Sequence, residues 1–150
     1  MANASHHDAE LILKLYDLRR EPEMRKARNF VGLEFWPNSM DDFAKNVSAP
    51  GSDANRYWRQ AISFWEMAAQ LVLHGALNEE LFVDTAGELF FFLAKFKPFL
   101  PELRKVQPEL FQAMETLATR TPAAREKLAA VEQRVAVVKQ RMQQAQTAKA

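Results

Sequence analysis

The feature that most constrains the fold of this chain is a stretch rich in apolar and aromatic residues from Ala54 to Leu100. As far as His74, its polar side chains fall on one side of a helical wheel and apolar side chains fill the rest. Because an ordinary surface helix carries only an apolar stripe, so wide an apolar arc predicts a helix that contacts several neighbours. Ser52 or Asp53 is the expected N-cap, and Gly75 stands where a left-handed residue commonly follows a helix.

A second helix is expected directly after this one, with Asn78 as its N-cap. One face of it carries apolar residues at spacings of three and four: Phe82, Ala86, Leu89, Leu93 and Phe96. The opposite face carries Asp84, Glu88 and Lys95, and Pro98 ends the pattern. A short linker between two apolar helices predicts antiparallel packing, so residues 54–97 are expected to form a central helical hairpin.

The rest of the chain also has helical periodicity, and no segment alternates with period two. Helices are predicted at 9–19, from Pro22 to before Pro37, from Pro101, from Pro108, and from Pro122 to about Gln146. Residues 1–8 are expected to be a frayed tail, and 46–52 a loop that is more simply a connector than a lid. The whole of 1–150 is therefore predicted to be a single all-α domain, a bundle of about six or seven helices built on the central antiparallel hairpin.

The long C-terminal helix over 122–146 has the clearest pattern for association. Its apolar residues alternate strictly by four and three: Ala124, Leu128, Val131, Val135, Val138, Met142 and Ala145. This 3.5-residue repeat is typical of coiled-coil packing. The stripe could pack on its own bundle or on another chain. We expect self-association through Leu128, Val131, Val135, Val138 and Met142, in a homodimer or with another protein partner.

Charge is distributed unevenly along the chain. From Arg120 onward there are seven basic and two acidic residues, so this end carries +5 and the remainder −4, given the net charge of +1. A basic helix beside an acidic body favours contact between the two, or contact with an acidic partner. The near-neutral total argues against a general nucleic-acid binder.

Several classes of protein are excluded or disfavoured by composition. The chain has no cysteine, which excludes disulfides, thiolate chemistry and cysteine-based zinc sites. No signal peptide is visible, and the most apolar window, 81–100, carries charges of both signs that disfavour a transmembrane span. His6 and His7 are adjacent and point apart on a helix, so they do not predict a metal site. We expect a cytoplasmic protein.

The search for chemistry centres on Glu66, which lies at the edge of the polar arc beside Trp65. A partly desolvated carboxylate there could act on a ligand, or it could pair with an arginine such as Arg104. An aromatic pocket for an apolar ligand is one interpretation of the nearby residues Trp58, Trp65, Glu66, Phe90, Phe91 and Phe92; plain burial of the phenylalanines is the other. No Glu-x-x-His pair, phosphate loop or nucleophile elbow is present, so we predict no catalytic residue, cofactor or metal.

Residues within 11–105 resemble a known family. They are Leu15 to Arg19, Met24-Arg25, Phe64-Trp65-Glu66, Leu71-Val72, Gly75 to Phe82, Lys97-Pro98 and Arg104. This pattern resembles a bacterial all-helical family of domains of unknown function, with an aromatic-Glu step in a long helix and a glycine turn before an acidic helix start. The resemblance implies an all-helical fold and no assigned activity, and it leaves the C-terminal helix outside.

We therefore expect a non-enzymatic, cytoplasmic helical interaction protein that self-associates through its C-terminal helix. The alternative is a helical protein that binds a small apolar ligand in an aromatic pocket near Glu66.

Overall fold

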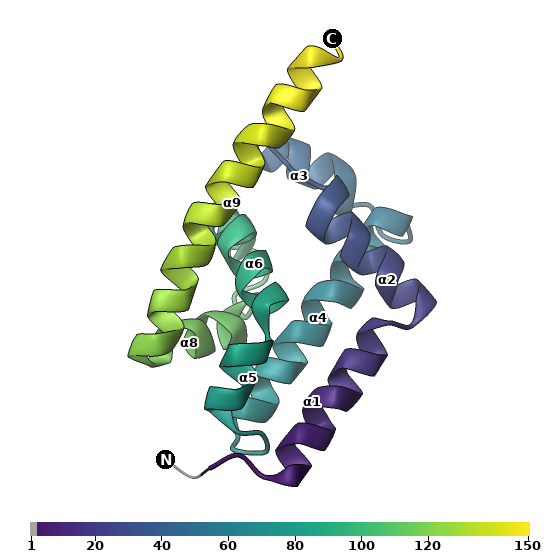
Figure 1. Cartoon of the computed structure of the whole chain (residues 1–150). Coiled ribbons are helices and arrows are strands. Elements are labelled where there is room, and N and C mark those ends of the chain that lie inside the picture. Colours follow the sequence, from purple (N-terminus) through teal and green to yellow (C-terminus); the bar gives the residue numbers. More distant parts are fainter. Residues whose placement is uncertain (1–2) are drawn as a thin grey trace.

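The computed structural model describes residues 3–150, which form helices joined by short connections, with no strand among them (Figure 1). The predicted all-α class is confirmed. The elements in chain order are α1 His6–Arg19, α2 Pro22–Asn29, the π-helix η1 Phe30–Glu34, α3 Met40–Val47, α4 Asp53–Leu73, α5 Glu79–Thr85, α6 Gly87–Phe96, the 3-10 helix η2 Lys97–Phe99, α7 Leu100–Leu103, α8 Gln112–Arg120 and α9 Pro122–Ala148. The segments exceed the six or seven expected because two predicted helices are divided, into α2 with η1 and into α5 with α6, and because α3 is an additional helix.

Helix α4 lies at the centre of the molecule, as its wide apolar arc predicts. It packs against α2, η1, α3, α5 and α8. The Ser52 side chain caps its start by accepting from the Asn55 amide at 3.1 Å. At its end Gly75 has φ +76, and the amides of Gly75 and Ala76 donate to the carbonyls of Val72 and Leu71. This pair of hydrogen bonds is the Schellman pattern, and it confirms the predicted glycine end.

The second arm of the expected hairpin is not one helix. It is divided at Ala86, whose φ of −93 and ψ of 46 separate α5 from α6. Thr85 Oγ1 donates back to the carbonyls of Leu81 and Phe82, and Gly87, a weak helix former, follows. The break lets α6 pack chiefly on α9 and α8. The prediction of one helix for the second arm is therefore wrong, and the antiparallel hairpin over 54–97 is not confirmed.

The N-terminal region is more ordered than predicted. Residues 1–8 were predicted to be a frayed tail. Residues 1 and 2 lie outside the described part. Helix α1 begins at His6, so the prediction is wrong for the last three residues of that segment. Ser5 and Asp8 form a capping box, and Asp8 Oδ1 also accepts from the Asn78 amide at 2.7 Å. These hydrogen bonds, first the one from the Ser5 side chain, lower the pKa of Asp8. The start of α1 is thereby joined to the start of α5.

The core is a cluster of aromatic rings supplied by elements from across the chain. Trp58 of α4 meets the rings of Phe96 and Phe43 edge-on at centroid distances of 4.7 and 4.9 Å, and Phe35 and Phe111 complete the cluster. Edge-to-face pairs at such distances are favourable beyond the area they bury. The cluster thus ties α3, α4 and α6 to the segments that precede α3 and α8.

Helix α9 begins as predicted and extends beyond the body. The Thr121 side chain caps it by accepting from the Ala124 amide at 3.2 Å. Its first half packs on α6 and α8, while its last turns project past the other helices (Figure 1). Among residues 3–150, no helix combines the length and the apolar character that crossing a membrane requires.

Candidate functional site

The six residues of the predicted aromatic pocket do not line one cavity. Trp58 and Glu66 line a cavity of about 1210 Å³ along α4, whereas Phe91 and Phe92 line another of about 790 Å³. Trp65 is 2% exposed and lines neither, because its ring packs against Phe64 and Phe82. Phe90 is fully buried and lines neither cavity. A single ligand therefore does not meet all six.

Glu66 has a structural partner that the sequence does not indicate. Its carboxylate accepts from the amides of Ala113 and Met114, at 3.2 and 3.4 Å, in the first turn of α8. The N-cap residue of α8 is Phe111, which has no side-chain oxygen and adopts φ +60, so Glu66 satisfies these amides from another helix. Helix α8 starts at Gln112, and not at Pro108 as predicted.

The expected arginine partner of Glu66 is therefore not observed. Arg104 pairs instead with Glu115, with Nη2 and Oε2 2.7 Å apart. Burial raises the pKa of Glu66, and the two amide hydrogen bonds oppose that rise. Arg104 adds only a weaker electrostatic contribution. The geometry assigns Glu66 the role of a helix cap.

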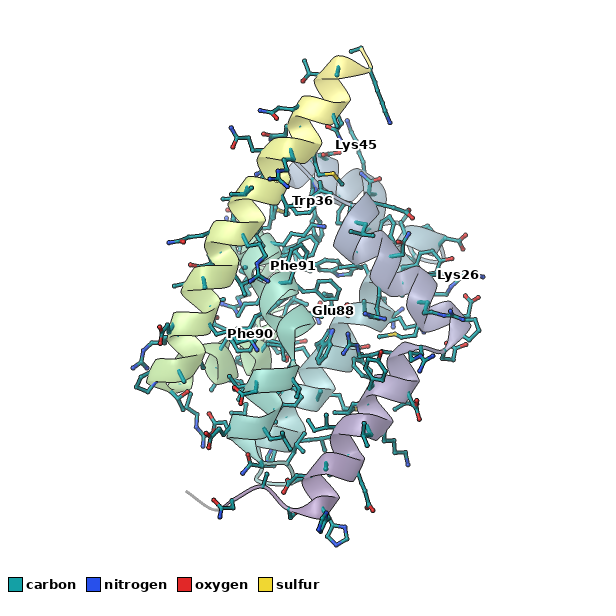
Figure 2. All side chains as sticks on the ribbon, in the orientation of Figure 1. Lys26, Trp36, Lys45, Glu88, Phe90 and Phe91 are labelled. Carbon is teal, nitrogen blue, oxygen red and sulfur yellow. The ribbon has the colours of Figure 1, made fainter. Side chains whose placement is uncertain are left out.

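The second cavity is the better candidate for a functional site. Its walls are one face of α2 with η1 and one face of α9, and the start of α6 forms its floor. We call it the α2–α9 groove; its lining residues are Arg25, Arg28, Asn29, Gly32, Leu33, Gly87, Glu88, Phe91, Phe92, Lys127, Ala130, Val131 and Arg134. Figure 2 shows Glu88 and Phe91 in the space between the α2 and α9 ribbons.

A preorganised charge network lies at one side of this groove. Glu88 of α6 accepts from Arg28 Nε at 2.8 Å and Nη2 at 2.7 Å, and from Trp65 Nε1 at 3.0 Å. Arg28 Nη1 donates to the Arg19 carbonyl, and the Arg19 guanidinium lies 5.0 Å from the Trp65 ring centroid. Two arginines thus share one carboxylate, which leaves the network with a net positive charge.

Further positive charge at the groove is not neutralised. Arg25 and Arg134 are exposed, and neither forms an ion pair with a carboxylate of residues 3–150. Lys127 donates to the carbonyls of Val83 and Asp84 at the end of α5. Its pKa is lowered, first by burial and also by the charge of Arg134, while Asp84 opposes the shift. The groove is therefore rimmed by cations from both walls.

The floor of the groove is aromatic. Phe92 is buried and Phe91 half-buried, and Phe91 meets Trp36 edge-on at 6.1 Å. Leu33 on the wall is 60% exposed, so the groove presents an apolar side chain to solvent. The groove thus combines an apolar base with basic rims.

Lys95, one turn beyond Phe91, is a buried amine close to the groove wall. It is 6% exposed; its Nζ donates to the carbonyls of Val31 and Gly32 in η1, at 2.6 and 3.3 Å, and lies 3.8 Å from the Trp36 ring centroid. Burial alone lowers the pKa of Lys95 to about 7. Its geometry indicates that it holds the π-turn of η1, which carries the groove residues Gly32 and Leu33.

The predicted association residues divide into two sets. Leu128, Val131 and Val135 are buried within this chain, whereas Val138 and Met142 are half-buried farther along α9. The first three therefore pack on their own bundle, the option that the sequence left open. No group of three or more His, Asp or Glu side chains able to hold a metal occurs in the described residues.

Sequence reasoning missed the groove, although a signal was present. Glu88 and Lys95 lie seven residues apart on one face of a helix that is otherwise too apolar for the surface. Polar groups in such a helix need partners, which here come from α2 and η1.

Comparisons with known proteins place the chain in a family. Residues 4–121 match the family described as Domain of unknown function (DUF4760). The match ends before α9, so Arg25 and Arg28 lie within it and Lys127 and Arg134 do not. No curated protein and no solved structure matches the chain. The sequence resemblance to an all-helical family without an assigned activity is thereby confirmed: the chain belongs to the DUF4760 family of domains of unknown function.

Proposed function

We propose that this chain is a non-enzymatic, cytoplasmic interaction protein that binds an acidic segment of a partner protein in the α2–α9 groove. The observation that supports the proposal most strongly is that Arg25 and Arg134 line the same cavity. They stand on opposite walls of one cavity, exposed and without a carboxylate partner in the described chain. The one acidic residue of the lining, Glu88, is already bound by Arg28.

Charge complementarity decides the class of partner. A groove with four basic lining residues and one neutralised carboxylate attracts anionic groups and repels basic ones. The exposed Leu33 and half-buried Phe91 add apolar contact that free small anions would not use. A protein segment with acidic and apolar residues satisfies both parts of the surface.

The test uses fluorescence anisotropy with a fluorescein-labelled oligoglutamate peptide. The wild type should bind it at low salt, and Arg25→Glu with Arg134→Glu should weaken binding by about tenfold or more. The matched control is Lys14→Glu with Arg141→Glu, which changes net charge equally at exposed sites outside the groove and should bind nearly as the wild type. Equal losses in both variants, or no binding by the wild type, would contradict the proposal.

Self-association through α9 is a second part of the proposal, now limited to its projecting end. Val137 is 48% exposed, and the half-buried Val138 and Met142 lie near it. A parallel or antiparallel contact between two such ends would cover these side chains. Light scattering should show a dimer that Val137→Glu dissociates and Gln140→Glu does not; a monomeric wild type at roughly tens of micromolar would remove this part.

A small apolar ligand in the cavity along α4 is the second candidate function. The cavity of about 1210 Å³ with Trp58 and Glu66 in its lining supports it. It ranks lower because Glu66 is engaged as the α8 cap and Trp58 is buried in the aromatic core. A rise in melting temperature with medium-chain fatty acids, abolished by Ser63→Trp at an exposed position of the lining, would favour it, and an unchanged melting temperature would oppose it.

A further inference from the structure

The α2–α9 groove has open space because small residues line it. Gly32 and Ala130 stand on opposite walls and Gly87 on the floor. A Cβ atom added at Gly87 would have no neighbour within 4 Å, and Ala130 is exposed. The 790 Å³ between the walls is thus not occupied by side chains of this chain.

Both walls present a regular helical face. On α9 the lining residues are spaced by three, four and seven: Lys127, Ala130, Val131 and Arg134. On α2 and η1 they follow the same kind of spacing: Arg25, Arg28, Asn29, Gly32 and Leu33. Each run spans about 10–12 Å at 1.5 Å per residue, or roughly two helical turns. Figure 1 shows α9 and α2 on opposite sides of α6.

The chemistry changes from the base of the groove to its rims. Phe91, Phe92 and Val131 make the base apolar, whereas Arg25 and Arg134 stand exposed on opposite walls. An occupant must therefore be apolar where it faces α6 and acidic on both flanks.

Backbone geometry selects the conformation of that occupant. In an extended segment, successive side chains point to opposite faces, so carboxylates that alternate with apolar residues would point away from the rims. In a helix, the positions flanking an apolar stripe point sideways, toward both walls at once.

We propose that the groove binds a short amphipathic helix of a partner protein, with its apolar stripe on Leu33 and Phe91 and carboxylates on both flanks facing Arg25 and Arg134. This inference rests on the proposed function, and it specifies the shape of the acidic partner. The bound helix would complete the bundle where α2 and α9 enclose a groove above α6.

The probe is a fluorescein-labelled peptide of glutamate, leucine and alanine, about 14 residues long, whose leucines recur every three or four residues. Its control is a scrambled peptide of the same composition. The wild type should bind the patterned peptide about tenfold more tightly than the scrambled one, and circular dichroism should show a gain of helix on binding.

A variant that fills the groove without changing its charge separates the contribution of shape to peptide binding from the contribution of charge. Ala130→Trp fills the groove without changing its charge, and Ala129→Trp is the matched control because Ala129 is exposed but outside the lining. Ala130→Trp should remove the preference for the patterned peptide while oligoglutamate still binds, and Ala129→Trp should leave both unchanged.

Failure of this inference is distinguishable from failure of the proposed function. If oligoglutamate binding depends on Arg25 and Arg134 but the patterned peptide shows no preference, or Ala130→Trp behaves as Ala129→Trp, the helical occupant is refuted and an acidic segment remains. If neither acidic probe binds, both proposals are overturned.

Discussion

The free energy of unfolding of the wild type, relative to that of the Lys95→Met variant, should increase as the pH rises above about 7. The Lys95 amine is buried, and its pKa is lowered from 10.5 to about 7. Because the folded-state pKa lies below the unfolded one, the unfolded chain binds more protons between these two values. The free energy of unfolding contributed by Lys95 therefore rises with pH from about 7 toward 10.5.

The magnitude follows from the linkage relation. Each pH unit between the two pKa values adds about 1.4 kcal/mol, so the wild type should gain about 2–3 kcal/mol over Lys95→Met between about pH 6 and about pH 9. Methionine keeps the apolar stem and cannot titrate, so the difference between the two unfolding curves isolates the amine.

The assay is urea unfolding of wild type and variant across that pH range, with Lys45→Met as an exposed-lysine control. Parallel stability curves would refute the reasoning. They would mean that the carbonyls of Val31 and Gly32 keep the ammonium charged despite its burial.

Three further predictions concern packing and caps. Trp65→Ala should lower the free energy of unfolding by about 3–5 kcal/mol in a urea melt, since the ring is fully packed; a loss below about 1 kcal/mol would contradict its burial. Glu66→Ala should cost about 1–2 kcal/mol because the α8 amides lose their cap. Glu66→Gln should be at least as stable as wild type at neutral pH, since the raised pKa makes the ionised form the costly one; a destabilised Gln variant would mean that the start of α8 favours the ionised carboxylate. Gly75→Ala should lower stability by about 1 kcal/mol through its positive φ, and Gly87→Ala, at a negative φ, should not; equal effects would contradict the left-handed end of α4.

Local signals in the sequence predicted the ends of the helices well. Ser52, Asn78 and Thr121 cap the helices they precede, and Gly75 ends α4 in the left-handed region. Each of these depends on residues within one turn of the helix end, so a single sequence contains the necessary information.

Features that depend on distant residues were not predictable in the same way. Glu66 caps α8 from 47 residues away, and Arg28 binds Glu88 across 60. The sequence shows that these side chains are polar, but not which backbone comes near them. The break at Ala86 was missed for a related reason, because the apolar spacing of Phe82, Ala86 and Leu89 fits one helix equally well.

The two walls of the groove are brought together by tertiary structure. Its walls come from α2 and α9, about 100 residues apart in sequence, and periodicity within α9 did not distinguish packing on its own bundle from packing on another chain. The buried Leu128 and Val131 settle that point for the first half of α9 only.

The most direct test of the account is a backbone amide NMR titration of ¹⁵N-labelled protein with the patterned acidic peptide. Shift changes should concentrate at residues 25–33, 87–92 and 127–134, and they should disappear when salt screens the rim charges. Changes concentrated along α4 near Trp58 and Glu66, or none at saturating peptide, would contradict the claim that the α2–α9 groove is the binding surface.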